Sequence, residues 1–158
     1  MNKLPENKTF GLELELSSAT ELSVEQVAAR LRDNRTDIDV ISSYIEGRST
    51  SSRWKIVPDT SITCNISQLD CHKFELVSPP LVAEKGLASV IQMLKKLVNI
   101  RPHIKVNKSI GFHVHIDVSV MTISQLIEIC QQFVKYEELI DSFLPPSRRS
   151  RSAESVSY

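Results

Sequence analysis

Residues 10–16, F-G-L-E-L-E-L, decide the predicted fold, because apolar and polar residues alternate along this stretch. Successive side chains of a β-strand point to opposite faces of its sheet. The stretch therefore predicts a strand that has three leucines on one face and two glutamates, Glu13 and Glu15, on the other. The two carboxylates lie next to each other on that face, with their Cβ atoms roughly 7 Å apart.

Three later stretches continue the same pattern and predict further strands at residues 53–57, 73–77 and 112–118. The second carries Glu75 opposite two apolar residues. The third places His113 and His115, followed by Asp117, opposite apolar residues. Together the four strands predict a sheet with one apolar face and one polar face.

Segments with helical periodicity lie between these strands. Ser23 can cap a helix that runs to about residue 32, a second helix spans about 84–98, and a third begins after Thr122 or Ser124 and ends near 143. Residues 33–52 are predicted to be a long loop or a weak hairpin. The fold class is therefore α+β: an antiparallel sheet with helices on its apolar face and a cleft open on its polar face.

Length and composition narrow the class of protein. The chain has 158 residues, 41% hydrophobic and 24% charged, which suits one globular domain and excludes a complete (β/α)₈ barrel of ~250 residues. We predict a domain over 1–146 and a Ser- and Arg-rich tail over 147–158. Nineteen basic residues balance nineteen acidic ones, so no bulk attraction to nucleic acid or to a membrane is expected.

The sequence also lacks several common signatures. The first ten residues do not contain the apolar segment of a secretory signal, and no apolar run is long enough to span a membrane. P-loop and dinucleotide-binding glycine motifs are absent. Cys64, Cys71 and Cys130 show no metal-binding or disulfide-scaffold spacing, so we expect reduced thiols in a cytoplasmic protein. Pairing of Cys64 with Cys71, or a metal shared between them, is the alternative.

The polar face carries the candidate chemistry. Two adjacent glutamates on a strand repel each other, and a divalent cation would relieve that repulsion; a solvated strand face is the alternative. His113 and His115 repeat the geometry with two imidazoles, which also occur as ordinary surface or core residues. Because both strands present adjacent ligands on one face, we predict a shared metal site that includes Glu75. Its excess of oxygen ligands favours Mg²⁺ or Mn²⁺ over structural zinc.

Ions of this kind usually hold phosphates as well as protein groups. Arg148 and Arg149 are the local positive charges that would bind such phosphates, although a solvated tail explains them nearly as well on charge alone. Two other protein classes that use His-x-His fit poorly. A cupin requires many short strands, and an amidohydrolase places the motif on the first strand of a barrel that this chain is too short to form.

Five motifs in order resemble those of the amidoligase family and span residues 10–149. They are F-G-L-E-L-E at 10–15, W-K-I-V-P-D-T-S at 54–61, F-E-L-V-S-P-P-L at 74–81, G-F-H-V-H-I-D at 111–117 and S-R-R at 147–149. That family is similar to glutamine synthetase and glutamate-cysteine ligase, within the carboxylate-amine ligases. The resemblance implies a glutamine-synthetase-like catalytic domain, of which this chain would hold the amino-terminal portion, since family members usually continue beyond the arginine pair.

The resemblance also implies an activity and residue roles. The activity would be ATP-dependent formation of an amide bond through an acyl phosphate, with small-molecule or peptide carboxylates and amines as substrates. Four residues would hold Mg²⁺ or Mn²⁺: Glu13, Glu15, Glu75 and His113. His115 would lie against the metal or an ATP phosphate, Arg148 and Arg149 would bind the ATP phosphates, and all three would be catalytic. A further group would lie near the substrate: Trp54, Asp59 and Ser61.

Two alternative functions are consistent with the same residues. The first is a truncated, noncatalytic module that retains the metal or nucleotide site. The second is a metal-dependent hydrolase in which the same ligands activate water.

Overall fold

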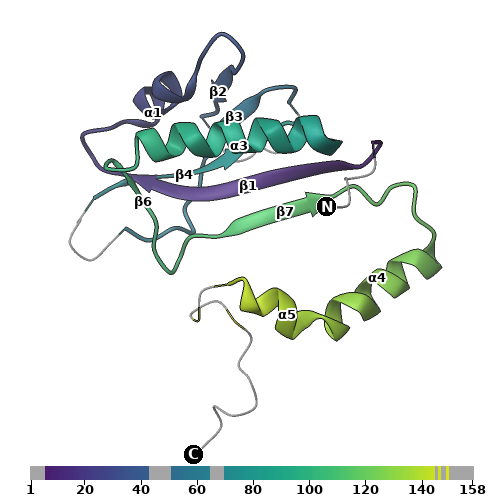
Figure 1. The fold of residues 1–158 in the computed structure, drawn as a ribbon. Coiled ribbons are helices and arrows are strands. Elements are labelled where there is room, and N and C mark those ends of the chain that lie inside the picture. Colours follow the sequence, from purple (N-terminus) through teal and green to yellow (C-terminus); the bar gives the residue numbers. More distant parts are fainter. Residues whose placement is uncertain (1–5, 43–50, 65–69, 145, 147–148, 150–158) are drawn as a thin grey trace, which may run out of the picture. The chain divides into compact units, whose positions relative to one another are not determined.

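The computed structural model describes residues 6–42, 51–64, 70–144, 146 and 149 (Figure 1). The chain divides into two compact units, Met1–Asp117 and Val118–Tyr158. The predicted domain over 1–146 spans both units. The predicted tail lies outside the described residues except for Arg149.

The first unit is built on a sheet of seven strands within the described residues (Figure 1). The strands are β1 (Thr9–Ser18), β2 (Ile38–Val40), β3 (Trp54–Pro58), β4 (His72–Val77), β5 (Leu81–Val82), β6 (Ile104–Lys105) and β7 (Phe112–Ile116). Strand β1 is central: β4 and β5 pair along one edge, and β7 and β6 pair along the other. All pairs are antiparallel except β2 with β3, which is parallel. The four strands predicted from alternation are confirmed as β1, β3, β4 and β7.

Among the described residues, two helices belong to the first unit, α1 (Val24–Leu31) and α3 (Ala83–Asn99), and two to the second, α4 (Ile123–Lys135) and α5 (Glu137–Ser142). Ser23 and Thr122 begin α1 and α4 with capping boxes, in which each hydroxyl accepts a hydrogen bond from a backbone N–H three residues on. The third predicted helix is wrong in one respect, because it is interrupted at Tyr136. None of the described helices is both long and apolar enough to cross a membrane.

The core of the first unit lies on the leucine face of β1. Leu12 and Leu16 are buried there, as are Phe74 and Leu76 of β4. Val27, Ala28 and Leu31 of α1 and Met93 of α3 pack into the same side, and Trp54 and Ile56 of β3 complete it. The predicted apolar face, covered by helices, is therefore confirmed for β1, β3 and β4, and α3 runs along β1 in Figure 1. It is not confirmed for β7, whose apolar residues Phe112, Val114 and Ile116 are exposed.

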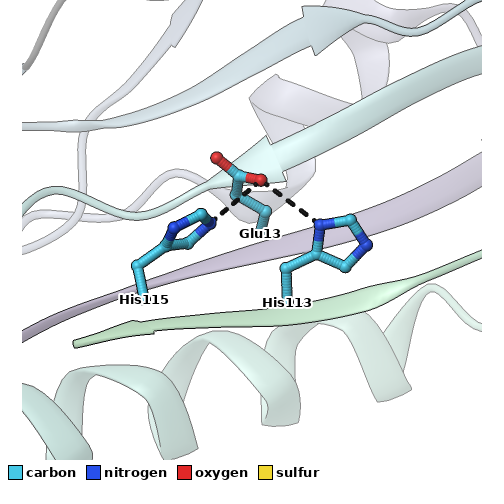
Figure 2. A group of neighbouring side chains, drawn as sticks. All are labelled: Glu13, His113 and His115. Carbon is cyan, nitrogen blue, oxygen red and sulfur yellow. Dashed lines mark ion pairs between the residues drawn. The ribbon is translucent and has the colours of Figure 1, made fainter. Parts of the chain in front are cut away.

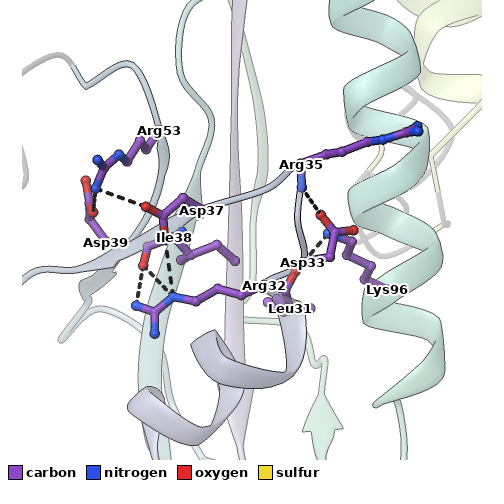
Figure 3. A network of polar contacts seen from close by, with 9 residues as sticks. All are labelled: Leu31, Arg32, Asp33, Arg35, Asp37, Ile38, Asp39, Arg53 and Lys96. Atoms are coloured by element: carbon purple, nitrogen blue, oxygen red, sulfur yellow. Dashed lines mark hydrogen bonds and ion pairs between the residues drawn. The ribbon is translucent and has the colours of Figure 1, made fainter.

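Strand β2 was not predicted as such, because residues 33–52 read as a loop or a hairpin. The observed strand has three residues and pairs parallel to β3, so the hairpin interpretation is wrong for the described part of this segment. Polar contacts hold β2 in place (Figure 3). Arg32 donates to the Ile38 carbonyl, and Arg53 lies 3.0 Å from Asp37 and 3.2 Å from Asp39.

The same network ties α1 to α3. Lys96 of α3 donates to the Leu31 carbonyl at 2.9 Å and lies 2.7 Å from Asp33 (Figure 3). The hydrogen bond from Lys96, followed by one from the Arg35 backbone N–H, lowers the pKa of Asp33 to about 2. Such contacts between distant segments leave no period in the sequence, which explains why β2 could not be predicted.

Cys64 and Cys71 form a disulfide, with Cα atoms 5.8 Å apart. The prediction of reduced thiols is therefore wrong for this pair, and the alternative pairing is confirmed. The two cysteines meet because Cys71 directly precedes β4 while Cys64 lies on the connection that leaves β3. Cys130 is free and exposed. Disulfides are typical of oxidising compartments, and the cytoplasmic location stays a prediction.

Gly86 lets α3 approach the sheet closely, which gives a test of this packing. A Cβ atom at this position would lie 2.7 Å from the Leu81 Cβ and 3.1 Å from Phe10 Cε1. Overpacking of this kind costs about 1–3 kcal/mol, which exceeds the helix propensity of up to about 1 kcal/mol gained from alanine. We expect Gly86→Ala to lower the free energy of unfolding in urea denaturation. A variant more stable than the parent would contradict this packing.

Candidate functional site

The antiparallel register brings the predicted ligands together, because residues directly opposite each other on neighbouring strands point to the same face. One row crosses four strands from β3 to β7 and consists of Lys55, Val77, Glu13 and His113. The next row crosses three strands and consists of Val57, Glu75 and Glu15. All these side chains lie on the face opposite the core.

The first candidate group consists of Glu13, His113 and His115. One carboxylate oxygen of Glu13 lies 3.6 Å from Nδ1 of His113 and 3.2 Å from Nε2 of His115. Figure 2 shows Glu13 between the two imidazoles of β7. One potential ligand atom from each residue lies within 4.8 Å of the others, so a single cation could contact all three.

The second candidate group consists of Glu15, Asp59 and Glu75, whose ligand atoms also lie within 4.8 Å of one another. The resemblance implied only that Asp59 lies near the substrate, so sequence reasoning missed this grouping. The Asp59 backbone N–H donates to the Lys73 carbonyl and thereby extends the β3–β4 pairing. The carboxylate accepts hydrogen bonds from the backbone N–H and the hydroxyl of Ser61, which orient it.

His113 lies between the two groups. Its Nδ1 faces Glu13, and its Nε2 lies 3.4 Å from Oε1 of Glu15. The other oxygen of Glu15 accepts a hydrogen bond from the backbone N–H of Gly111, at the entry to β7. Glu15 is therefore held by backbone on one side and approached by an imidazole on the other, which suits a carboxylate that must keep one orientation.

Burial is the main reason why the pKa of Glu75 is raised above its ordinary value of 4.5. The carboxylates of Glu13, Asp59 and Glu15 raise this pKa further, in that order, while His113 opposes them. The two groups thus hold several negative charges close together, because the rest of the fold keeps the strands that carry them paired. A cation would relieve this repulsion.

A cleft of about 610 Å³ adjoins the first group. Its walls come from β1, β3, β4 and β7, and its lining includes Gly11, Glu13, Lys55, Glu75 and His115. Sequence reasoning missed Lys55 as a site residue. The available signal was its position beside Trp54, since alternation along β3 places one of the two on the polar face.

The other predicted residues lie as follows. Trp54 packs in the hydrophobic core, while Ser61 contacts Asp59. Arg149 belongs to the second unit, where it donates to the Leu144 carbonyl, and Arg148 lies outside the described residues. Their contact with phosphate, and the proximity of Trp54 and Ser61 to a substrate, stay predictions.

Comparison with known proteins gives one family. Residues 6–155 match the family model described as "Putative amidoligase enzyme". No curated protein matches the chain. No solved structure matches it either. The match covers nearly the whole sequence, including both candidate groups.

Substitution of Gly111 tests the arrangement of the two groups. A Cβ atom there would overlap with Nε2 of His113 and lie 3.1 Å from Cδ of Glu15, so the imidazole must move. We expect Gly111→Ala to weaken Mn²⁺ binding roughly tenfold or more in isothermal titration calorimetry, as for other substitutions around metal ligands. In the matched control Gly11→Ala, the added Cβ makes only ordinary contacts at 3.8 and 3.9 Å. Equal Mn²⁺ affinities of the two variants would contradict this geometry.

The raised pKa of Glu75 predicts a pH-dependent stability. Its contribution is fully present below the ordinary value and is lost as the pH rises through the raised value, because the folded state then holds an ionised carboxyl among like charges. Without divalent cations, we expect Glu75→Gln to melt at a higher temperature than the parent at pH 7, with the difference shrinking towards pH 4. Melting curves in EDTA measure this, with Glu84→Gln, at an exposed position on α3, as control. A lower melting temperature of Glu75→Gln at pH 7 would overturn the argument.

Proposed function

Because the chain belongs to the amidoligase family, we propose that its polar face binds divalent cations and ATP and joins a carboxylate to an amine. The observation that carries this proposal is the convergence of the two groups on neighbouring strands. Four carboxylates and two imidazoles supply mainly hard oxygen ligands, which suit Mg²⁺ or Mn²⁺. The donor set therefore fits the proposed ions.

The proposed residue roles follow from position. Glu13 and His113 would hold one cation, with His115 at its exposed side, where a nucleotide phosphate has access. Glu15, Asp59 and Glu75 would hold a second cation. When bound, the cations would neutralise charge on the phosphoryl group during transfer. For Arg148 and Arg149, family membership rather than position suggests that they neutralise further phosphate charge.

The proposed reaction has two steps. An oxygen of the substrate carboxylate attacks the terminal phosphorus of ATP, and the bond to ADP breaks. The amine nitrogen then attacks the acyl carbon of the resulting acyl phosphate, inorganic phosphate leaves, and the nitrogen loses a proton. The contribution of the protein is to hold both substrates in line and to oppose their negative charge, so no nucleophilic side chain is required. This chemistry corresponds to that of glutamine-synthetase-like ligases.

Metal binding is the first test. We expect Glu13→Gln to weaken Mn²⁺ binding at least tenfold, since even residues behind the ligands of a metal site contribute ten- to hundredfold. The glutamine keeps the size of the side chain and removes one negative charge. The control is Glu84→Gln, because Glu84 is exposed at the start of α3 on the opposite side of the sheet. Electron paramagnetic resonance of free Mn²⁺ gives the affinities, and equal values for Glu13→Gln and the parent would refute the ligand assignment.

Turnover is the second test and separates the proposal from its alternatives. The full chain is incubated with Mg²⁺, ATP and pooled carboxylates and amines, and release of ADP is compared with and without the amines. Amine-dependent ADP release together with a new amide supports the ligase. Cleavage of amides or esters without ATP would replace it by a hydrolase, and binding of Mg²⁺ and ATP without turnover would replace it by a binding module.

A further inference from the structure

Lys55 is a charged residue on the polar face that the proposed roles do not use. It is only 6% exposed, which is rare for a lysine unless its ammonium interacts with polar or charged groups. Its partner in the register is Val77, which in turn pairs with Glu13, so all three side chains lie in one row across the sheet. Lys55 lines the cleft from β3, together with Val57.

The cleft has room over Gly11. Gly11 forms part of its floor, and even an added Cβ would find its nearest neighbours at 3.8 and 3.9 Å. His115, the register partner of Gly11, lines the cleft from β7. A ligand over Gly11 would thus lie between a lysine on one wall and an imidazole on the other, next to Glu13 of the first group.

Charge makes an anion the matching ligand. Two divalent cations would balance the four carboxylates of the two groups: Glu13, Glu15, Asp59 and Glu75. Lys55 would then add positive charge to a cleft whose metal-binding carboxylates are neutralised by the cations. Asp117, a further carboxylate that lines the cleft, is exposed, so solvent screens its charge. In a partly desolvated cleft, such charge attracts anions more strongly than it does in bulk water.

We propose that Lys55 binds an oxyanion of the substrate, a carboxylate or a phosphate, in this cleft beside the metal-bound first group. This inference rests on the proposed function, because it takes the metal-loaded cleft as its starting state. A lysine ammonium suits the role, since its three donors rotate to meet either a planar or a tetrahedral anion. The part of the cleft that Lys55, Gly11 and Val77 line would therefore accept an anionic group of the ligand.

A purely structural lysine makes a different prediction. If Lys55 serves only to offset the charge of nearby glutamates, its removal leaves anion binding unchanged and alters only stability and metal affinity. Anion affinity in the presence of saturating Mg²⁺ therefore separates the two roles.

The experiment uses the full chain and three variants. Lys55→Met keeps the length and apolar stem of the side chain, Lys55→Arg keeps its charge, and Lys85→Met is the control, because Lys85 is exposed on α3. Inorganic phosphate and acetate are titrated separately with Mg²⁺ present and followed by two-dimensional NMR. We expect at least a tenfold loss of affinity for one of the two anions in Lys55→Met, retention within about threefold in Lys55→Arg, and no change in Lys85→Met. The anion affected identifies the ligand as phosphate or carboxylate.

The result separates this inference from the proposed function. Mn²⁺ binding and the fluorescence of Trp54, the single tryptophan, report metal affinity and folding of each variant. If the parent binds Mn²⁺ but binds neither anion, or if Lys55→Met binds both as well as the parent does, the role of Lys55 is refuted and the metal site stands. If the parent binds no Mn²⁺, the proposed function fails, whatever the anions do.

Discussion

The pairing of β1 along both of its edges is the constraint on which the rest of the structure depends. Along one edge Glu15 lies opposite Glu75, and along the other Glu13 lies opposite His113. Without this double pairing, the ligands of the two groups would come from segments that do not meet. The same pairing buries the leucine face of β1 beneath α1 and α3, so one interaction supplies both the core and the polar face.

This arrangement lowers the stability of the fold at the candidate site. Like charges opposite each other on adjacent strands are destabilising, and the pKa of Glu75 is raised first by burial and further by the neighbouring carboxylates. The apolar core on the other side of the sheet, together with the disulfide beside β4 and the network around Asp33 and Lys96, keeps the strands paired despite it. Neighbouring glutamates are unfavourable in a sheet, and here they occur where a cation would compensate for their repulsion. Exceptions of this kind to the local rules of strand formation are typical of functional sites.

Prediction from sequence succeeded where a pattern is local. Alternation located β1 and β7 and assigned each glutamate and histidine to the correct face, because side-chain direction in a strand depends only on its period of two. It failed where the structure depends on distant contacts. Strand β2 is held by Arg32 just after α1, Arg53 just before β3 and Asp37 just before β2 itself, and Cys64 meets Cys71 across the connection between β3 and β4. Neither contact has a period or a spacing to detect.

For the candidate site, the amino-acid sequence by itself determined which side chains are candidate ligands, the strands that carry most of them and the family to which the chain belongs. Only the tertiary structure decided how they divide: Glu13 with the two histidines, and Glu15 with Glu75 and Asp59. It also placed Trp54 in the core and Lys55 in the cleft. The physical reason is that alternation defines the two faces of a strand, whereas the register between strands, set by core packing and backbone hydrogen bonds, decides which side chains share a row.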